Sequence, residues 1–289
     1  MNRSTAAASL ILPAPAKLNL FLHILGRRPD GYHELQTLFQ LLDHGDELEL
    51  TTTRGGTLEV ITEPALADVP MTANLAYRAA LALRRHKPGP AGARIRIRKR
   101  LPPGGGLGGG SSDAATALLG LNRLWGLDLG IDELCALGQQ LGADVPVFIR
   151  GRTAWGEGIG ERLTPLELPE AWYLVVKPDC AVATAAVFGH PELTRDTRAM
   201  KIRAFFGEGA ANDCQSVVEA MYPQVRAARL WLERYAQPRL TGTGACLFAR
   251  FEDEGEARAA LAEMPPVWSG FVARGVNISP LHRDLYPVG

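Results

Sequence analysis

Two different spacings of hydrophobic residues occur along the chain, and together they predict both strands and helices. Apolar side chains take every second position, or form short continuous runs, in segments that are typical of strands. The predicted strands cover residues 16–25, 46–53, 57–63, 93–101, 172–178, 245–251 and 270–277, and a further short apolar strand is expected after Asp144. Elsewhere apolar side chains recur every three or four positions, which predicts helices. The predicted helices cover residues 74–86, 111–126, 131–142, 212–235 and 253–264, and Pro223 is expected to break the fourth.

These elements mix without a strict alternation of strand and helix, so the predicted fold class is α+β. The chain has 289 residues, which is enough for two ordinary domains. A proline-marked segment near residues 163–169 gives the expected boundary, which divides the chain into residues 1–163 and 164–289. The alternative is that the last strand, near residues 270–280, returns to the first domain.

The balance of charges limits the kinds of macromolecular partner that the sequence predicts. The formal net charge is zero, from 31 basic and 31 acidic residues, so neither nucleic acid nor an acidic membrane surface is predicted as a partner.

An apolar run at residues 6–12 is too short to cross a bilayer, and no later run reaches the ~18 residues of a spanning helix. The cysteines form no CxxC pair, which favours reduced thiols over a metal site. They are Cys135, Cys180, Cys214 and Cys246. A cytoplasmic protein is predicted.

A glycine-rich segment, LPPGGGLGGGSS at residues 101–112, lies between a predicted strand and a predicted helix. Without Cβ atoms its backbone N–H groups can converge, and the helix N-terminus behind it adds unpaired N–H groups and a partial positive charge. This placement predicts a phosphate site rather than a flexible linker. Gly104, Gly106 and Gly109 also match GxGxxG, but the preceding strand is half polar and two prolines follow it, so a dinucleotide fold is disfavoured.

Residue chemistry alone does not decide the roles of the polar residues near this loop and in the first strand. Ser111 or Ser112 is either a helix N-cap or a hydroxyl on phosphate or Mg²⁺, and the two roles are compatible. Asp144 is either a half-desolvated general base, flanked by apolar residues, or a turn residue that bonds the backbone. Lys17 lies in an apolar strand, where a lone lysine usually extends its charged end to the surface.

The pattern Pro-x-Gly-Gly-Gly-Leu-Gly-Gly-Gly-Ser-Ser resembles the GHMP kinases, the family of galacto-, homoserine, mevalonate and phosphomevalonate kinases. Residues 15–35, 142–148 and 240–249 narrow the resemblance to the branch that acts on 4-(cytidine 5′-diphospho)-2-C-methyl-D-erythritol. The resemblance runs from about Pro15 to His282, with the motifs in the same order. It implies a first domain like domain 2 of ribosomal protein S5 and a second domain like ferredoxin.

The resemblance also implies an enzyme that uses ATP and Mg²⁺ to phosphorylate the 2-hydroxyl of that small molecule in isoprenoid precursor synthesis. It implies a monomer or weak homodimer and assigns no protein ligand to Mg²⁺. The alternative within the family is a kinase of homoserine or of a mevalonate-type substrate. The alternative outside enzymes is a sensor that binds ATP without chemistry, which the presence of both Lys17 and Asp144 disfavours.

By resemblance, Asp144 takes or orients the proton of the substrate hydroxyl and Lys17 is its partner, with the alternative that Lys17 has the larger role. Phe188 is expected as the second face of a cytosine sandwich, with core packing as the alternative. The residues expected to contact the substrate are Asn19, Tyr32, His33, Thr184, Phe188, Gly242 and Gly244. The residues expected to bind ATP are Asn74, Leu75, Lys99, Pro102, Pro103, Gly104, Gly105, Gly106, Leu107, Gly108, Gly109, Gly110, Ser111 and Ser112.

Overall fold

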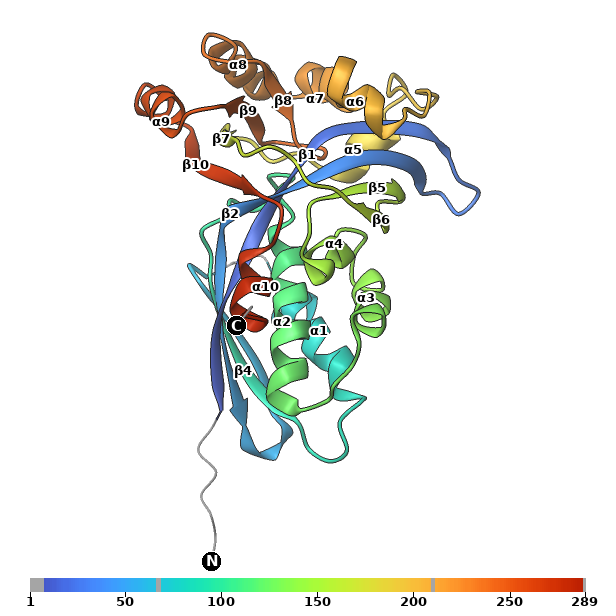
Figure 1. The fold of residues 1–289 in the computed structure, drawn as a ribbon, viewed down its shortest axis with the longest axis vertical. Coiled ribbons are helices and arrows are strands. Elements are labelled where there is room, and N and C mark those ends of the chain that lie inside the picture. The colour runs from blue at the N-terminus through green and yellow to red at the C-terminus, as the bar shows by residue number, and fades with distance from the viewer. Residues whose placement is uncertain (1–7, 66–68, 209–210, 288–289) are drawn as a thin grey trace, which may run out of the picture.

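The computed structural model describes residues 8–65, 69–208 and 211–287, and it confirms the predicted α+β class (Figure 1). The strands are β1 (Ser9–Arg27), β2 (His33–Thr53), β3 (Leu58–Glu63), β4 (Gly92–Arg98), β5 (Ala154–Gly158), β6 (Arg162–Pro165), β7 (Trp172–Lys177), β8 (Pro238–Leu240), β9 (Leu247–Phe251) and β10 (Ser269–Val276). The helices are α1 (Leu75–Arg84), α2 (Gly109–Trp125), α3 (Ile131–Gln139), α4 (Val145–Arg150), α5 (Thr184–Gly189), α6 (Ile202–Glu208), α7 (Gln215–Met221), α8 (Pro223–Leu232), α9 (Glu254–Ala262) and α10 (Pro280–Leu285).

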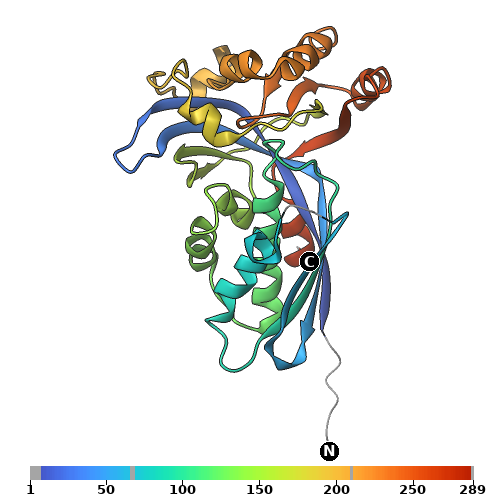
Figure 2. The same cartoon turned by 180° about the vertical axis from the view of Figure 1, so that it is seen from behind.

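The first unit, at the bottom of Figure 1, is a sheet of β1 to β4 with helices on one face (Figures 1 and 2). β2 pairs antiparallel with both β1 and β4, and β3 pairs in parallel with β4. The alternation in β4 acts as predicted. Ile95 and Ile97 are buried, whereas Arg94, Arg96 and Arg98 pair with glutamates on the other face. The hydrophobic core of this unit therefore lies between the sheet and α1, α2, α3 and α4.

The second unit, at the top of Figure 1, is an antiparallel sheet in the order β10-β7-β9-β8. The chain passes from β7 through helices to β8 and β9, and then through α9 to β10. This β-α-β-β-α-β course is ferredoxin-like, as the resemblance implies. Pro223 is the first residue of α8 and separates it from α7, so the predicted break is confirmed.

The two units are joined by continuous backbone pairing. β1 and β2 form a long ribbon that runs through the first unit and bends beneath the second (Figure 1). β10 pairs with β7 over Ser269–Arg274 and then with β2 at Gly275 and Val276. The chain returns to the first unit after β10, where α10 buries Leu281 and Leu285 in the first core. A ligand site between the units is thus held by strands that belong to both.

Two local predictions were wrong. Residues 145–150 form α4 rather than a strand, because Pro146 in the first turn suits a helix start and Gly151 ends the helix with a positive φ of 62°. Helix α2 begins at Gly109, with Gly108 as its N-cap, so Ser111 and Ser112 lie inside the first turn and neither is the N-cap. The first seven residues, with the start of the apolar run at residues 6–12, lie outside the described residues.

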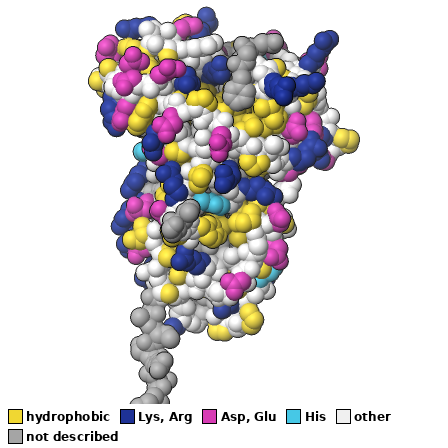
Figure 3. Space-filling model, viewed as in Figure 1, with side chains coloured by type: hydrophobic (Ala, Val, Ile, Leu, Met, Phe, Trp, Pro, Cys, Tyr) yellow, Lys and Arg dark blue, Asp and Glu magenta, His cyan; other side chains and the backbone are white. Residues whose placement is uncertain are grey.

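Basic and acidic side chains are interspersed over the face shown in Figure 3. Arg94 and Arg98, for example, pair with Glu59 and Glu47. Among the described residues, no helix is both long and apolar enough to cross a membrane.

Candidate active site

Two cavities lie on either side of the glycine-rich loop and share part of its wall. The larger has a volume of about 750 Å³ and the smaller about 360 Å³. The residues that line both cavities are Gly104, Gly106, Gly108 and Ser111. Ligands bound in the two cavities would therefore lie close to each other, on opposite sides of the loop.

The loop packs closely against both units, and a side chain would not fit at several of its glycines. A Cβ atom on Gly106, whose φ is 75°, would overlap the backbone carbonyl of Thr241. A Cβ atom on Gly108 would lie 2.8 Å from the Phe148 ring. The N–H groups of Ala245 and Cys246 donate to carbonyls of the same loop. The glycines therefore allow both a close approach and left-handed backbone that other residues rarely adopt.

Helix α2 starts where the two cavities meet. The first hydrogen bond of the helix runs from the N–H of Ser112 to the carbonyl of Gly108, 2.8 Å away. Among the described residues, no acceptor takes the N–H groups of Gly109, Gly110 and Ser111 in that turn. Unpaired N–H groups and the positive end of the helix dipole make this turn an anion site.

Lys17 and Asp144 form an ion pair in the larger cavity. The Nζ atom of Lys17 lies 3.1 Å from Oδ2 of Asp144 and donates a 2.5 Å hydrogen bond to Oδ1 of Asn19. The side chain of Lys17 is only 3% exposed, so it does not extend to the surface as a lone strand lysine usually does. Asp144 makes no side-chain bond to the start of α4, so the structure does not give it the role of a turn residue.

Asn19 connects this pair to both units. Its side chain donates to Thr37 in β2 at 2.9 Å, and its backbone N–H donates to the hydroxyl of Thr241 at 3.0 Å. The hydroxyl of Thr241 donates in turn to the carbonyl of Gly106 at 3.1 Å. The pairing of β1 with β2 shifts register on each side of Lys17 and Asn19, which is a common way to aim side chains beside a site.

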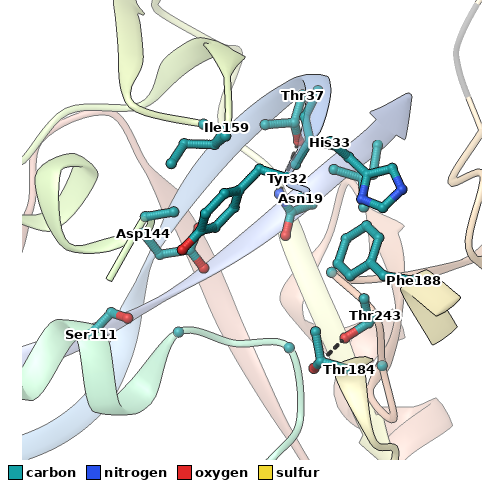
Figure 4. A pocket seen from close by; sticks show the side chains of 18 of the residues that line it. Asn19, Tyr32, His33, Thr37, Ser111, Asp144, Ile159, Thr184, Phe188 and Thr243 are labelled. Carbon is teal, nitrogen blue, oxygen red and sulfur yellow. Dashed lines mark hydrogen bonds between the residues drawn. The ribbon is translucent and has the colours of Figure 1, made fainter. Parts of the chain in front are cut away.

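Aromatic side chains line the far end of the larger cavity. His33 and Phe188 stack on each other, with ring centroids 4.9 Å apart and planes 22° apart. Figure 4 shows Tyr32 between this pair and Asp144, with Ser111 at the opposite end of the cavity. Burial, helped by the charges of Arg195 and Arg27, lowers the pKa of His33, which keeps the imidazole neutral at pH 7. Planar apolar surfaces with a polar edge suit an aromatic base.

The remaining wall comes from the second unit. The hydroxyls of Thr184 and Thr243 lie 2.9 Å apart (Figure 4). Gly242 and Gly244 flank Thr243 with φ values of 57° and 87°. Both glycines line the larger cavity, so the structure brings every residue expected to contact the substrate to one hollow.

A buried triad of charges lies beside the smaller cavity, and two of its members, Lys99 and Asp113, line that cavity. The ammonium of Lys99 bonds the carboxylates of Asp46 and Asp113, and Asp46 also accepts the backbone N–H groups of Arg100 and Leu101 at 2.6 and 2.8 Å. Burial raises the pKa of Asp113 to about 7; the charge of Asp46 adds to this, and that of Lys99 opposes it. The triad thus ties the end of β4 and the start of the loop to α2.

Two family models match this chain. The model of the GHMP kinases N terminal domain matches residues 74–152, and the model of the GHMP kinases C terminal matches residues 195–269. A 4-diphosphocytidyl-2-C-methyl-D-erythritol kinase of Pseudomonas aeruginosa is 56% identical over 276 residues, covering 96% of this chain and 97% of the relative. A kinase of the same name from Tolumonas auensis is 54% identical, with 96% of each chain covered. The chain belongs to the GHMP kinases, in the branch of these relatives.

Solved structures agree with this placement. A crystal structure of 4-(cytidine 5′-diphospho)-2C-methyl-D-erythritol kinase matches with a TM-score of 0.80 and 33% identity, covering 92% of this chain and 100% of the other. The Methanococcus jannaschii mevalonate kinase matches with a TM-score of 0.69 at 15% identity, covering 95% of this chain and 100% of the other. The second match shows that the fold is shared across the family.

The predicted site residues of this GHMP kinase gather around the two cavities, with one exception. Asn74 and Leu75 line the smaller cavity, where Asn74 also caps α1 by accepting the N–H of Ala76. Ser112 does not line either of these cavities, and its buried hydroxyl has no hydrogen-bond partner among the described residues. Its neighbour Ser111 lines both.

Sequence reasoning missed several polar residues that hold the site of this GHMP kinase. They are Thr37, Asp46, Asp113, Arg195, Thr241 and Thr243. Asp113 directly follows Ser112, and Thr241 directly precedes Gly242, so proximity to a motif was a usable signal for these two. Asp46, by contrast, reads as one polar residue of an alternating strand.

Proposed function

We propose that this GHMP kinase transfers the terminal phosphoryl group of ATP to the 2-hydroxyl of 4-(cytidine 5′-diphospho)-2-C-methyl-D-erythritol. The proposal assigns ATP to the smaller cavity and the cytidylyl substrate to the larger one. The observation that carries it is the position of the Lys17–Asp144 ion pair, which lies in the larger cavity beside the wall that the two hollows share. Phosphoryl transfer depends on such positioning more than on covalent chemistry by the protein.

The residues of the smaller cavity fit a nucleoside triphosphate. The unpaired N–H groups at the start of α2, beside the glycine loop that lines this cavity, offer a cradle for phosphate oxygens. Asn74, Leu75 and Pro103 line the part assigned to the base. When bound, ATP would supply the phosphoryl group, and its Mg²⁺ would neutralise negative charge on the phosphate oxygens.

The residues present also fit a cation that is held mainly by phosphate oxygens. The described part of the chain has no group of three or more His, Cys, Asp or Glu side chains placed to hold a metal ion. Mg²⁺ commonly keeps waters and binds one or two protein groups together with substrate phosphates. We assign this contact to the hydroxyl of Ser111, which lines both cavities.

Asp144 and Lys17 have different roles in the reaction of the substrate hydroxyl. One oxygen of Asp144 faces Lys17, and the carboxylate is one-third exposed to the cavity, so it can accept or orient the hydroxyl proton. Lys17 is fixed by Asn19 and places a positive charge beside the transferring group. Both side chains act from the substrate side of the loop.

The aromatic end of the larger cavity accounts for the cytidine. His33 and Phe188 are in contact, so a base does not fit between them without separating the rings. The geometry favours a base packed between Tyr32 and Phe188, with the polar edge of His33 beside it (Figure 4). A homoserine or mevalonate-type substrate has no base to occupy this end.

The test is an ADP-release assay with Mg²⁺-ATP and the purified full chain. 4-(Cytidine 5′-diphospho)-2-C-methyl-D-erythritol, homoserine and mevalonate are compared as acceptors. Turnover with the cytidylyl substrate alone supports the proposal, and mass spectrometry of the product checks that one phosphoryl group was added. Turnover with homoserine or mevalonate alone contradicts the substrate assignment. ATP binding without turnover of any acceptor contradicts the kinase activity itself.

A further inference from the structure

Arg195 lies directly behind the aromatic end of the larger cavity and makes four hydrogen bonds there. Its Nη2 donates to the carbonyls of Phe188 and His190, both at 2.8 Å, and its Nη1 donates to the carbonyl of Leu193 at 2.9 Å. Its Nε donates to Nε2 of His33 at 3.3 Å. Arg195 does not itself line the cavity. One guanidinium thus reaches both members of the stacked ring pair from outside the site.

The bond from Arg195 to His33 determines which ring nitrogen carries the proton. A guanidinium has donors only and stays charged, so Nε2 of His33 must accept with its lone pair. A neutral imidazole carries one proton, which then lies on Nδ1. The charged groups that shift this ring are Arg195 and Arg27, which faces His33 across the β1–β2 pairing. Both are positive, so the neutral form is favoured and the ring keeps Nδ1–H as a donor.

The other three bonds fix the position of Phe188. They end on Phe188 in the last turn of α5, on its C-cap His190, and on Leu193 in the segment that follows. A carbonyl at the end of a helix lacks an intrahelical partner, and Arg195 supplies one. Phe188 is therefore held by its own backbone as well as by its contact with His33. Movement of Arg195 would release both rings together.

We propose that Arg195 is a positioning residue that makes this end of the cavity select cytosine over uracil, by holding the His33 proton on Nδ1 and Phe188 in place. This inference rests on the proposed function, because it concerns the base of the same substrate. The Watson–Crick edge of cytosine has an acceptor at N3, whereas uracil has an N–H donor there. A fixed N–H donor on His33 pairs with the first and opposes the second.

The first experiment compares CMP and UMP as competitive inhibitors of the wild-type enzyme, the Arg195→Gln variant and the Arg198→Gln variant. Arg198 is an exposed arginine of the same segment and serves as the matched control. We expect the wild type and Arg198→Gln to prefer CMP. We expect Arg195→Gln to lose roughly tenfold of that preference, because an unpaired His33 can present either a donor or a lone pair. The KM for ATP should not change.

A purely structural role for Arg195 predicts a different result. In that case CMP and UMP would weaken by the same factor, and the inference would be overturned. The same holds for an Arg195→Gln variant that keeps the wild-type preference. A cycle with His33→Ala adds a second check. In the His33→Ala background, Arg195→Gln should have no further effect on the CMP-to-UMP ratio, whereas an additive effect contradicts the coupling.

The tautomer can be read in the wild-type enzyme, so the inference does not depend on a folded variant. Long-range ¹H–¹⁵N spectra of histidine-labelled protein distinguish Nδ1–H from Nε2–H, and His33→Ala assigns the signal among the six histidines. Nδ1–H supports the inference and Nε2–H overturns it. A wild type that turns over the cytidylyl substrate but shows Nε2–H refutes only this inference. A wild type that neither binds CMP nor turns over that substrate refutes the proposed function as well.

Discussion

Lys17 and Asp144 lie 3.1 Å apart but differ sharply in their access to solvent, at 3% and 33% exposed. The ammonium of Lys17 is buried and donates a hydrogen bond to Asn19, whereas the carboxylate of Asp144 is exposed to the cavity. A substrate hydroxyl can therefore meet Asp144 directly, with Lys17 fixed beside it. The pair joins β1 to the start of α4, so the geometry depends on how these two elements pack.

Replacing Asp144 by asparagine should remove the proton acceptor with little change in shape. We expect kcat to fall by about two to four orders of magnitude with little change in KM, which is the range for loss of general base catalysis. Steady-state kinetics with the cytidylyl substrate measure this. Asp132→Asn, at an exposed carboxylate of α3, is the control and should keep wild-type rates. A fully active Asp144→Asn variant would show that the carboxylate is not the base.

Two glycines of the loop, Gly104 and Gly106, allow the cost of backbone strain to be measured separately from the cost of steric overlap. Gly104 and Gly106 both have positive φ values, of 64° and 75°, but a Cβ atom on Gly104 meets nothing within 4 Å. A Cβ atom on Gly106 would displace the Thr241 carbonyl and, through it, the contact to Asn19. Gly104→Ala should cost about 1 kcal/mol from backbone strain alone.

Gly106→Ala should therefore lower Tm clearly more than Gly104→Ala does. Thermal unfolding of the two purified variants beside the wild type gives the comparison. Equal losses of Tm would mean that the loop and residue 241 move apart easily. The close approach would then not be what requires a glycine at position 106.

Phe188 should contribute to binding of the base but not to the chemical step. Removing a stacking ring costs about 1–3 kcal/mol per base, so Phe188→Ala should raise the KM for the cytidylyl substrate by about tenfold or more. The KM for ATP should stay the same, because Phe188 lies at the far end of the larger cavity. Phe271→Ala is a suitable control, since that ring stacks on His44 outside both cavities. An unchanged KM for the substrate would assign Phe188 to core packing.

Much of this molecule could be predicted from sequence because local patterns decide local structure. The alternation in β4, the break at Pro223 and the loop before α2 each depend on residues close together in the chain. The short α4 was mistaken for a strand because a run of apolar residues, VPVF, fits both structures when it is fully buried. Its helical form follows from Pro146 and from burial against α2 and α3.

Contacts between residues that are far apart in the sequence could not be predicted from the sequence. Asp46 pairs with Lys99 only because β2 and β4 are neighbours, and Arg195 reaches His33 only after the second unit folds over the β1–β2 ribbon. Neither contact leaves a spacing that can be recognised in one sequence. The resemblance to a family supplied the expected Lys17–Asp144 partnership, and the fold brings the two side chains together.

Asp113 should make stability depend on pH in a direction opposite to that of most carboxylates. Its pKa is raised to about 7 in the folded state, mainly by burial, so the folded state binds its proton more tightly than the unfolded chain does. The stabilisation from this proton is complete below the unfolded pKa of about 3.9 and is lost as pH rises through 7. Asp113→Asn resembles the protonated form at every pH. The Tm of Asp113→Asn relative to the wild type should therefore rise between pH 5 and pH 8.

Differential scanning fluorimetry at both pH values measures this change. Asp132→Asn, which alters an exposed carboxylate, should keep a nearly constant difference from the wild type. Lys99 limits the size of the effect, because its ammonium bonds Asp113 and favours the ionised form. A Tm difference that falls with pH would mean that the charge of Lys99 outweighs burial. The triad would then hold two ionised carboxylates around one ammonium.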